Sequence, residues 1–389
     1  MEALTGKNYV VYHLHSDLSN GVTNIDSVTK FGEYIEKAAS LGMKTLGFSE
    51  HGSVFAWLDK KEEIEKAGMK YIHGAEVYVT ATLEEKVRDN MHCVLLAKDF
   101  DGLLELNRLI SASFDREDGH FYYVPRITLD ELFGTSEHLI VTTACVGGIL
   151  NKGTEADQEA MLDFCQRHKD RCFLEIGHHI DQKQVEYNKR MLTYSRERGI
   201  RLIAGTDTHA LNRQHERGRS ILQISKNIHF DGEENWNLQF LSYDELVAEY
   251  RRQGALPEDV YLEAIENTNL MADMILEYDI DKSIKYPHIY DNPEETFVQK
   301  IDEAIATHPY ATKNHSMEEI RRRVQSELDV YKTVGAIDFM LLEVYMREWE
   351  HSHGIQCGYG RGSVSGSFIA YLLGITQMDS IKYDLNFFR

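Results

Sequence analysis

Short apolar runs alternate with helical patterns along the first 210 residues. Seven runs have the length and the content of strands, at residues 9–14, 44–49, 71–79, 92–97, 138–144, 172–176 and 201–206. Most are separated by stretches with helical spacing, two of which end at Gly42 and Gly68, as helices commonly do. Repeated strand–helix units indicate an α/β fold with a mostly parallel sheet. Seven units in this length favour a closed (β/α) barrel, slightly smaller than the eight-stranded type.

The pattern changes after the last of these units. Residues 215–285 have the spacing of a helical connector, and the chain turns helical again from residue 294. A glycine-rich stretch then precedes an apolar helix near residue 370. We therefore expect two domains, a barrel with its connector at 1–280 and a mostly helical domain at 281–389.

Composition narrows the class of protein only slightly. Hydrophobic residues make up 42% and charged residues 27%, as in ordinary globular proteins, and no apolar run is long enough to span a membrane. The N-terminus lacks the layout of a signal peptide, and five scattered cysteines without a CxxC pair suggest a reducing compartment, so we expect a cytoplasmic protein. A net charge of −21 argues against coating nucleic acid electrostatically but leaves local contacts open.

Metal-type residues gather where the predicted strands end. His13 and His15 follow the first strand at i and i+2, which places both on one side, and Asp207 with His209 repeats this after the last strand. The strands between them carry His51, Glu76, His92 and Cys145, and then Glu175, His178 and His179. Each residue alone is more often part of a core. Because strand ends of a barrel converge on one face, the set together predicts a metal site. His92 is the misfit, since it opens its strand.

The mixture of ligands favours particular ions. Imidazoles with carboxylates and one thiolate suit zinc, manganese or iron better than magnesium or calcium. Seven or eight ligands are too many for one ion, so we expect two or three. Clustered ions suit hydrolysis of a phosphate ester, because one lowers the pKa of a water while others neutralise phosphoryl oxygens.

These motifs resemble a known family. "HLHSDLSNG", "GFSEHGSVFAW", "HGAEVYV", "HCVLLAK", "TTACVGG" and "AGTDTHALN" are similar, in order, to the motifs of the PHP (polymerase and histidinol phosphatase) superfamily. The longer stretches "HCVLLAKDFDGLLELNRLIS", "FYYVPRI" and "LIVTTACVGGIL" resemble the N-terminal region of the bacterial DNA polymerase III alpha family. The resemblance implies a distorted seven-stranded barrel of PHP type.

The resemblance also implies roles for individual residues. His13, His15, Glu76 and Asp207 resemble one metal site, His51 and His209 a second, and His92 and Cys145 a third that Glu76 bridges. Catalysis would fall to His51, Asp207 and His209. Where the family often has an aspartate ligand, this chain has Asn20, whose neutral amide is a weaker ligand. Glu50, Arg126 and His179 are expected behind the ligands or in contact with phosphate.

The glycine-rich stretch "CGYGRGSVSGSFIAYLLGIT" has two interpretations. A glycine turn that opens a helix presents free N–H groups to a phosphate, whereas a tight turn of small residues could serve helix packing alone. The stretch resembles the GRGS segment in the palm of bacterial replicative polymerases, which implies that Gly360, Arg361, Gly362 and Ser363 hold a nucleotide triphosphate. In that family the aspartates that hold magnesium follow this point, and no such motif follows Gly362 here.

We therefore expect the N-terminal region of a DNA polymerase III alpha-type protein, with a PHP barrel joined to part of the palm. Its own chemistry would be metal-dependent phosphoester hydrolysis of the 3′–5′ exonuclease type, without polymerisation by this chain. The resemblance implies DNA, dNTP and other replisome subunits as partners, and no membrane. Two alternatives remain open, namely a stand-alone phosphatase resembling histidinol phosphatase and a catalytically silent scaffold stabilised by metals.

Overall fold

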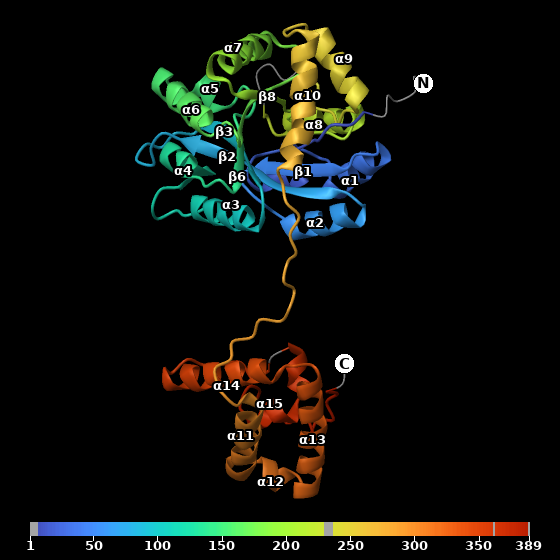
Figure 1. Cartoon of the computed structure of the whole chain (residues 1–389). Helices are drawn as coiled ribbons and strands as arrows, with labels where there is room; N and C mark the ends of the chain where they lie inside the picture. The colour runs from blue at the N-terminus through green and yellow to red at the C-terminus, as the bar shows by residue number, and fades with distance from the viewer. Residues whose placement is uncertain (1–6, 229–235, 361, 388–389) are drawn as a thin grey trace. The chain divides into compact units, whose positions relative to one another are not determined.

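The computed structural model describes residues 7–228, 236–360 and 362–387. The chain divides into two compact units, Met1–Asp279 and Ile280–Arg389, each with a hydrophobic core (Figure 1). In the described part, no helix is long and apolar enough to cross a lipid bilayer.

A curled mixed sheet forms the centre of the N-terminal unit. Its strands are β1 (Thr45–His51), β2 (Lys70–Thr80), β3 (Met91–Ala97), β4 (Phe121–Tyr122), β5 (Val124–Thr128), β6 (Leu139–Thr142), β7 (Cys172–Ile176) and β8 (Arg201–Ala204). They lie in the order β4-β5-β2-β3-β6-β7-β8, and β1 also pairs with β2. β1 with β2, β2 with β5, β6 with β7 and β7 with β8 are parallel, whereas β3 is antiparallel to both β2 and β6. The predicted α/β class is confirmed, with β3 reversed.

The segment expected as the first strand joins the two edges of the curled sheet. It forms single bridges rather than a regular strand, from Val11 to Leu46 of β1 and from Leu14 to Thr208 beyond β8. The Gly47 N–H donates to the Val11 carbonyl at 2.9 Å, and the His15 N–H donates to the Thr208 carbonyl at 2.8 Å. Residues 11–15 therefore close the curled sheet and bring its first and last strands together.

Alternate residues of the strands fill the interior of the ring. Val10, Tyr12, Ile72, Val94, Leu96, Ile140, Phe173 and Ile203 form one buried cluster with Met271 and Ile275. Since neighbouring side chains on a strand face opposite sides, the other positions pack outward against the helices. The interior of the ring is thus a packed apolar core, and the histidines and carboxylates of the candidate site lie at one end of it.

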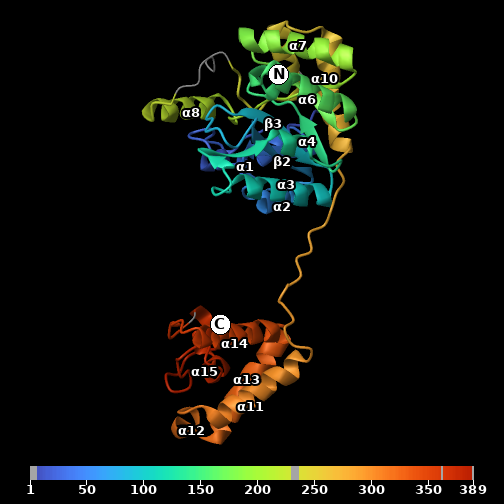
Figure 2. The ribbon, with the colours of Figure 1, turned by 90° about the vertical axis from the view of Figure 1, so that its left-hand side faces the viewer.

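Helices cover the outside of this sheet. They are α1 (Phe31–Ser40), α2 (Trp57–Lys66), α3 (Phe100–Ser113), α4 (Leu129–Phe133), α5 (Ile149–Lys152), α6 (Glu155–Arg167), α7 (Gln182–Arg198), α8 (Arg213–Ser225), α9 (Tyr243–Gln253) and α10 (Glu258–Asp273). Both ribbon views place α2 and α3 on one side of the sheet and α6, α7 and α10 on the other (Figures 1 and 2). Capping boxes begin α4, at Thr128 with Glu131, and α9, at Ser242 with Glu245.

The C-terminal unit is helical in its described part. Its elements are α11 (Pro293–Thr307), α12 (Ala311–Asn314), α13 (Met317–Thr333), α14 (Ile337–Ser352), a 3-10 turn at Gly362–Gly366 and α15 (Phe368–Leu372). Their apolar faces share a core that includes Phe297, Ile301, Val324, Leu341 and Phe368.

Candidate metal centre

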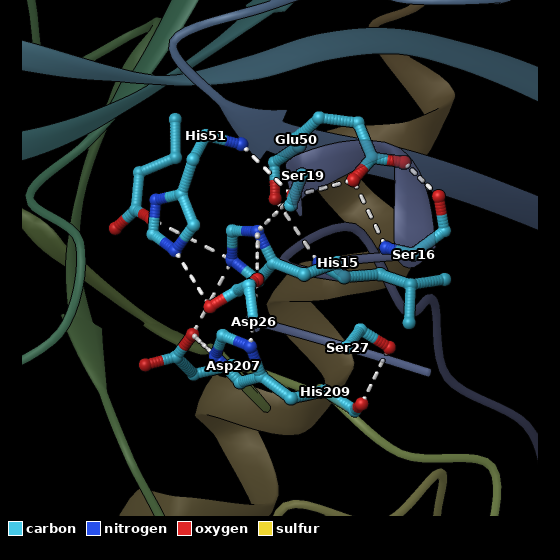
Figure 3. A network of polar contacts seen from close by, with 12 residues as sticks. His15, Ser16, Ser19, Asp26, Ser27, Glu50, His51, Asp207 and His209 are labelled. Carbon is cyan, nitrogen blue, oxygen red and sulfur yellow. Dashed lines mark hydrogen bonds and ion pairs between the residues drawn. The ribbon is translucent and has the colours of Figure 1, made fainter. Parts of the chain in front are cut away.

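Five of the predicted ligand residues meet at one end of the ring, on three stretches of chain. His15, His51 and His209 stack, with ring centroids 4.2 Å apart for His15 and His51 and 4.5 Å apart for His15 and His209. Asp207 Oδ1 lies 3.3 Å from His13 Nε2 and 3.0 Å from His209 Nε2. All five side chains are buried or nearly so, and Figure 3 shows the rings of His15, His51 and His209 with Asp207 turned toward one another.

The backbone explains why these side chains converge. His13 and His15 come from the closing segment, His51 ends β1, and Asp207 with His209 follows β8. Asp207 has φ of 43°, in the left-handed region that aspartate tolerates better than most residues. Such local strain is often found at functional sites.

The reversed direction of β3 accounts for the position of His92. Because β3 runs antiparallel to β2, its first residues reach the rim where the parallel strands end. His92 pairs with Tyr78 across the ladder, and its Nδ1 lies 3.0 Å from Glu76 Oε1. A histidine at the beginning of a strand therefore joins histidines that end other strands.

Glu76 and the histidines form a set of buried atoms without a hydrogen bond. The buried atoms His13 Nε2, His15 Nε2, His51 Nδ1 and Glu76 Oε2 make no hydrogen bond of good geometry, although His51 Nδ1 lies 2.9 Å from Glu76 Oε2. Three groups bring possible ligand atoms within 4.8 Å of one another, namely His15/His51/His209, His13/His15/Glu76 and His51/Glu76/His92. Buried polar atoms are normally paired, and these all face the same small region. The donor set fits divalent cations.

The charges at the cluster support the same interpretation. Burial opposes ionisation of Glu76, but His92, His51 and His13 together hold its pKa well below the usual value. His13 and His209 act likewise on Asp207 and hold its pKa low against the effect of burial. The carboxylates are therefore anionic at neutral pH and available to a cation.

Cys145 lies in the wall of the same cavity, whose volume is about 710 Å³. It belongs to none of the three groups found among the described residues. Burial, and then Asp207 and Glu76, raise the pKa of its thiol well above the ordinary value. The thiolate would form there only beside a compensating cation.

Asp26 reaches the cluster although the sequence pattern did not indicate it. Its Oδ1 lies 3.3 Å from His51 Nε2 and its Oδ2 lies 3.1 Å from His209 Nδ1. The side chain is 4% exposed, and the two histidines hold its pKa well below the usual value in spite of burial. The available signal in the sequence was a carboxylate between the HxH motif and the first helix, six residues beyond Asn20.

Asn20 braces the loop that carries Asp26. Its Oδ1 accepts hydrogen bonds from the N–H groups of Asp26 at 2.6 Å and Ser27 at 3.2 Å, and its Nδ2 donates to the Ser27 carbonyl at 2.7 Å. Both polar atoms of Asn20 are therefore used within the loop. The expectation that Asn20 is a weak ligand is corrected, because its amide is used within the loop and the carboxylate beside His51 and His209 is that of Asp26.

Glu175 supports His13 from behind. The sequence placed Glu175 at a strand end without a role. Its Oε1 lies 2.6 Å from His13 Nδ1, and its Oε2 accepts hydrogen bonds from Tyr12 Oη at 2.9 Å and Thr142 Oγ1 at 2.8 Å. Because a carboxylate only accepts, this contact places the proton on His13 Nδ1 and leaves Nε2 with a lone pair that a cation could use, an arrangement common behind metal-bound histidines.

Glu50 is a second buried support. It accepts hydrogen bonds from the Ser16 N–H at 2.9 Å, from Ser19 Oγ at 2.6 Å and from Lys60 Nζ at 2.6 Å. It thereby holds the turn that follows the HxH motif (Figure 3).

Arg126 and His179 differ in what they do. Arg126 donates to the carbonyls of Gly119 at 2.6 Å, His120 at 3.1 Å and Glu85 at 3.2 Å, so it ties two loops together rather than facing a phosphate. This corrects the expected phosphate contact. His179 is buried and stacks on Trp236, with ring centroids 4.9 Å apart.

The glycine-rich stretch lies in the C-terminal unit, and Arg361 falls outside the described residues. Gly362 and Ser363 line a hollow of about 210 Å³. The start of α15 is not free, because the Glu327 carboxylate accepts from the N–H groups of Phe368 at 2.8 Å and Ile369 at 3.0 Å. The expectation of unpaired N–H groups at this helix is therefore wrong, since a carboxylate of α13 already occupies them.

Known proteins resemble the chain over nearly its whole length. Residues 12–179 match the PHP domain family, and residues 294–389 match the bacterial DNA polymerase III alpha NTPase domain family. The DNA polymerase III subunit alpha of Borreliella burgdorferi is 30% identical, over 98% of this chain and 34% of that protein. The protein of the same name from Aquifex aeolicus is 28% identical, over 98% of this chain and 35% of that protein.

The chain thus spans about a third of the length of these curated relatives. Among solved structures, an amidohydrolase from Chromobacterium violaceum aligns with a TM-score of 0.36 and 15% identity, over 62% of this chain and 96% of that chain. The two family matches and the relatives agree on both units: the N-terminal unit is similar to the PHP domain family, and the chain is similar over nearly its whole length to part of the proteins named DNA polymerase III subunit alpha.

Proposed function

We propose that the N-terminal unit is a metal-dependent phosphoesterase that removes nucleotides from DNA ends with 3′–5′ exonuclease-type chemistry. The observation that supports this proposal most is the convergence of four buried ligand atoms without a hydrogen bond, from His13, His15, His51 and Glu76, beside an open cavity. The DNA substrate, and a place beside other replisome subunits, come from the relatives, which are named DNA polymerase III subunit alpha. The C-terminal unit would take a dNTP at Gly360, Gly362 and Ser363.

The same residues would form up to three ion sites. We assign His13, His15, Glu76 and Asp207 to the first, and Asp26, His51 and His209 to the second. His92 and Cys145 would form a third, bridged by Glu76. The donors favour zinc, manganese or iron. When bound, such ions lower the pKa of a water and neutralise phosphoryl oxygens.

The chain's own residues would position the substrate and handle protons. His51, Asp207 and His209 line the cavity, where a phosphodiester would enter. Burial lowers the pKa of His209, but Asp26 and Asp207 outweigh that effect and raise it to about 9. That value holds for the site without an ion; an ion at the second site would keep His209 neutral, and the carboxylate on each side fixes the orientation of its ring.

The position of Asp26 argues against a catalytically silent scaffold, and the family match of residues 294–389 argues against a stand-alone phosphatase. A silent scaffold drew its support from a neutral amide in the second site, and Asp26 supplies a carboxylate there instead. A stand-alone small-molecule phosphatase would have no use for residues 294–389, which match a polymerase family. Both observations favour the exonuclease.

Metal content and hydrolysis, measured on one preparation, test the proposal. We expect about two or three transition-metal ions per chain by elemental analysis, because eight or nine donors surround the site. Manganese-loaded protein should shorten a 5′-labelled single-stranded oligonucleotide from its 3′ end. His51→Ala should abolish this activity, whereas His138→Ala, at a half-exposed histidine outside the cavity, should retain it. Fewer than one ion after careful loading, or equal activity in both variants, would contradict the proposal.

A further inference from the structure

Trp236 forms part of the cavity wall and is held rigidly there. Its side chain is half-buried, and its Nε1 donates to Asp181 Oδ2 at 2.9 Å. Asp181 caps α7 through the Lys183 N–H, so the acceptor is itself fixed. One face of the indole lies flat on His179, with the two rings 4° from parallel. The indole is thus oriented in advance, with one face already covered.

The backbone next to Trp236 is tied to the strands that carry the metal centre. His178 Nε2 lies 3.0 Å from the Asn237 carbonyl, at the end of β7. The His209 N–H donates to the Leu238 carbonyl at 2.9 Å. The position of the indole is therefore coupled to that of His209, across the same cavity.

A second residue of the wall points to a ligand. Asn90 lines the cavity, is 4% exposed, and has an Oδ1 without a hydrogen-bond partner. Its Nδ2 donates to the Arg88 carbonyl at 3.2 Å, so the side chain is not free to turn. A buried acceptor without a donor is costly, and a ligand with an O–H or N–H group would satisfy it.

Basic side chains in the cavity wall indicate that the ligand carries negative charge. Arg88, Lys152 and Lys183 line the cavity of a chain whose net charge is −21. Of the acids in the wall outside the ligand cluster, Asp89 pairs with Lys152, and Asp181 holds Trp236 and the start of α7. A flat apolar surface, a buried acceptor and cations around one cavity fit a molecule with a ring, a hydroxyl or amino group, and phosphates.

We propose that Trp236 stacks on the base of the terminal nucleotide of a nucleic-acid strand, while Asn90 accepts a hydrogen bond from that nucleotide. This inference rests on the proposed exonuclease and adds to it the residues that would hold the terminal nucleotide by its base. Stacking tolerates any base, because every base has a π face. Since His179 covers the other side of the indole, the site takes one base.

Binding tests the stacking without any need for hydrolysis. Trp57→Phe with Trp349→Phe leaves Trp236 as the single tryptophan of the chain. This variant, treated with a chelator, is titrated with a short oligothymidylate that ends either in a normal 3′ nucleotide or in an abasic one. We expect fluorescence quenching by the normal oligonucleotide, with about tenfold weaker binding of the abasic one, which is about 1.4 kcal/mol. Equal binding of both, or no quenching, would overturn the inference.

The preference of the manganese-loaded protein for a normal over an abasic 3′ end provides a second measurement. The ratio of rates on normal and abasic 3′ ends should fall about tenfold in Trp236→Leu and be kept in Trp236→Phe, which retains an aromatic face. Trp349→Leu, at a half-exposed tryptophan of the C-terminal unit, is the matched control and should keep the wild-type ratio. If Trp236→Leu slows both substrates equally, the indole only closes the cavity and the stacking is refuted. If wild-type protein hydrolyses neither substrate, the phosphoesterase fails, while the fluorescence titration still decides the base site.

Discussion

Asp26 and Asn20 lie six residues apart, and only one of them faces the metal centre. The side-chain amide of Asn20 makes hydrogen bonds with the backbone of Asp26 and Ser27, whereas the Asp26 carboxylate contacts His51 and His209. Asn20, which was expected to be a weak ligand in place of an aspartate, instead holds the loop that positions the Asp26 carboxylate. Variants at the two positions should have different effects.

Asp26→Asn should remove the charged oxygen from the second site with almost no change in shape. We expect it to lower metal occupancy and to slow hydrolysis by at least about tenfold, or 1.4 kcal/mol of transition-state stabilisation. Asp17→Asn, in the same loop, is the control and should leave both unchanged. Asn20→Asp should bring no gain, because it loses the bond to the Ser27 carbonyl. A rate increase in Asn20→Asp would show that this loop can deliver a ligand from either position.

Glu175→Gln should weaken metal binding although Glu175 is not assigned as a ligand. The amide can still accept from Tyr12 or Thr142, but it no longer holds the proton on His13 Nδ1 with a full charge. Loss of such a supporting carboxylate typically costs about 10–100-fold in metal affinity. Competition with a fluorescent zinc chelator measures this, with Glu186→Gln on α7 as the control. An unchanged affinity would show that His13 needs no orientation.

At the scale of elements, β2 and α3 share a buried histidine outside the metal centre. His73 Nδ1 lies 3.0 Å from Tyr71 Oη and its Nε2 lies 3.0 Å from Asn107 Oδ1. Burial lowers the pKa of His73 to about 4. The folded pKa lies below the unfolded value, so this histidine costs stability as pH falls from about 6.5 toward 4.

His73→Gln should therefore reduce the acid sensitivity of the N-terminal unit. Wild-type protein should lose roughly 2 kcal/mol of unfolding free energy from this histidine between pH 7 and pH 5, and the variant should not. Urea unfolding at the two pH values measures the difference. His351→Gln, at an exposed histidine, should behave as wild type. The same pH sensitivity in His73→Gln would place the titrating group elsewhere.

Glu327 joins α13 to α15 in the C-terminal unit. It is fully buried, accepts from Ser367 Oγ at 2.7 Å and from two N–H groups of α15, and pairs with Arg323 Nε at 2.6 Å. Glu327→Gln should destabilise this unit by about 3 kcal/mol, because it breaks a buried charge network. Thermal unfolding followed by circular dichroism measures this, and the exposed Glu318→Gln serves as the control. A loss below about 0.5 kcal/mol would mean that solvent, or the amide oxygen of the replacing glutamine, accepts from the N–H groups of the helix start equally well.

At the scale of the whole molecule, all residues assigned to the metal centre belong to the N-terminal unit. Ions that bind the folded centre should raise the unfolding temperature of this unit, because binding to the native state alone adds to its stability. Trp349 belongs to the C-terminal unit, so its fluorescence in Trp57→Phe with Trp236→Phe should report a transition that zinc or chelator does not move. A shift of that transition on chelation would show that the two units are coupled.

Six of the strands, β1, β2, β3, β6, β7 and β8, and most of the residues that gather at the candidate metal centre were predicted from the sequence itself. The short strands β4 and β5 were not, and residues 9–14 form single bridges rather than the expected strand. Periodicity depends on local spacing, and the HxH and DxH pairs face one side wherever the backbone is extended. The helical character of the second unit followed in the same way. The capping boxes at Thr128 and Ser242 are likewise local, since each involves residues three positions apart.

Other features depended on contacts between residues far apart in the chain. The direction of β3, which brings His92 to the rim, is set by its pairing with β2 and β6 rather than by its own residues. Asp26 rather than Asn20 contacts His209, because the path of the loop decides which side chain reaches the site. Glu327 of α13 accepts from the N–H groups at the start of α15, which the glycine pattern alone predicted to be free. Side-chain periodicity depends on neighbours along the chain, whereas strand pairing, loop paths and buried charge pairs are settled only when distant segments pack together.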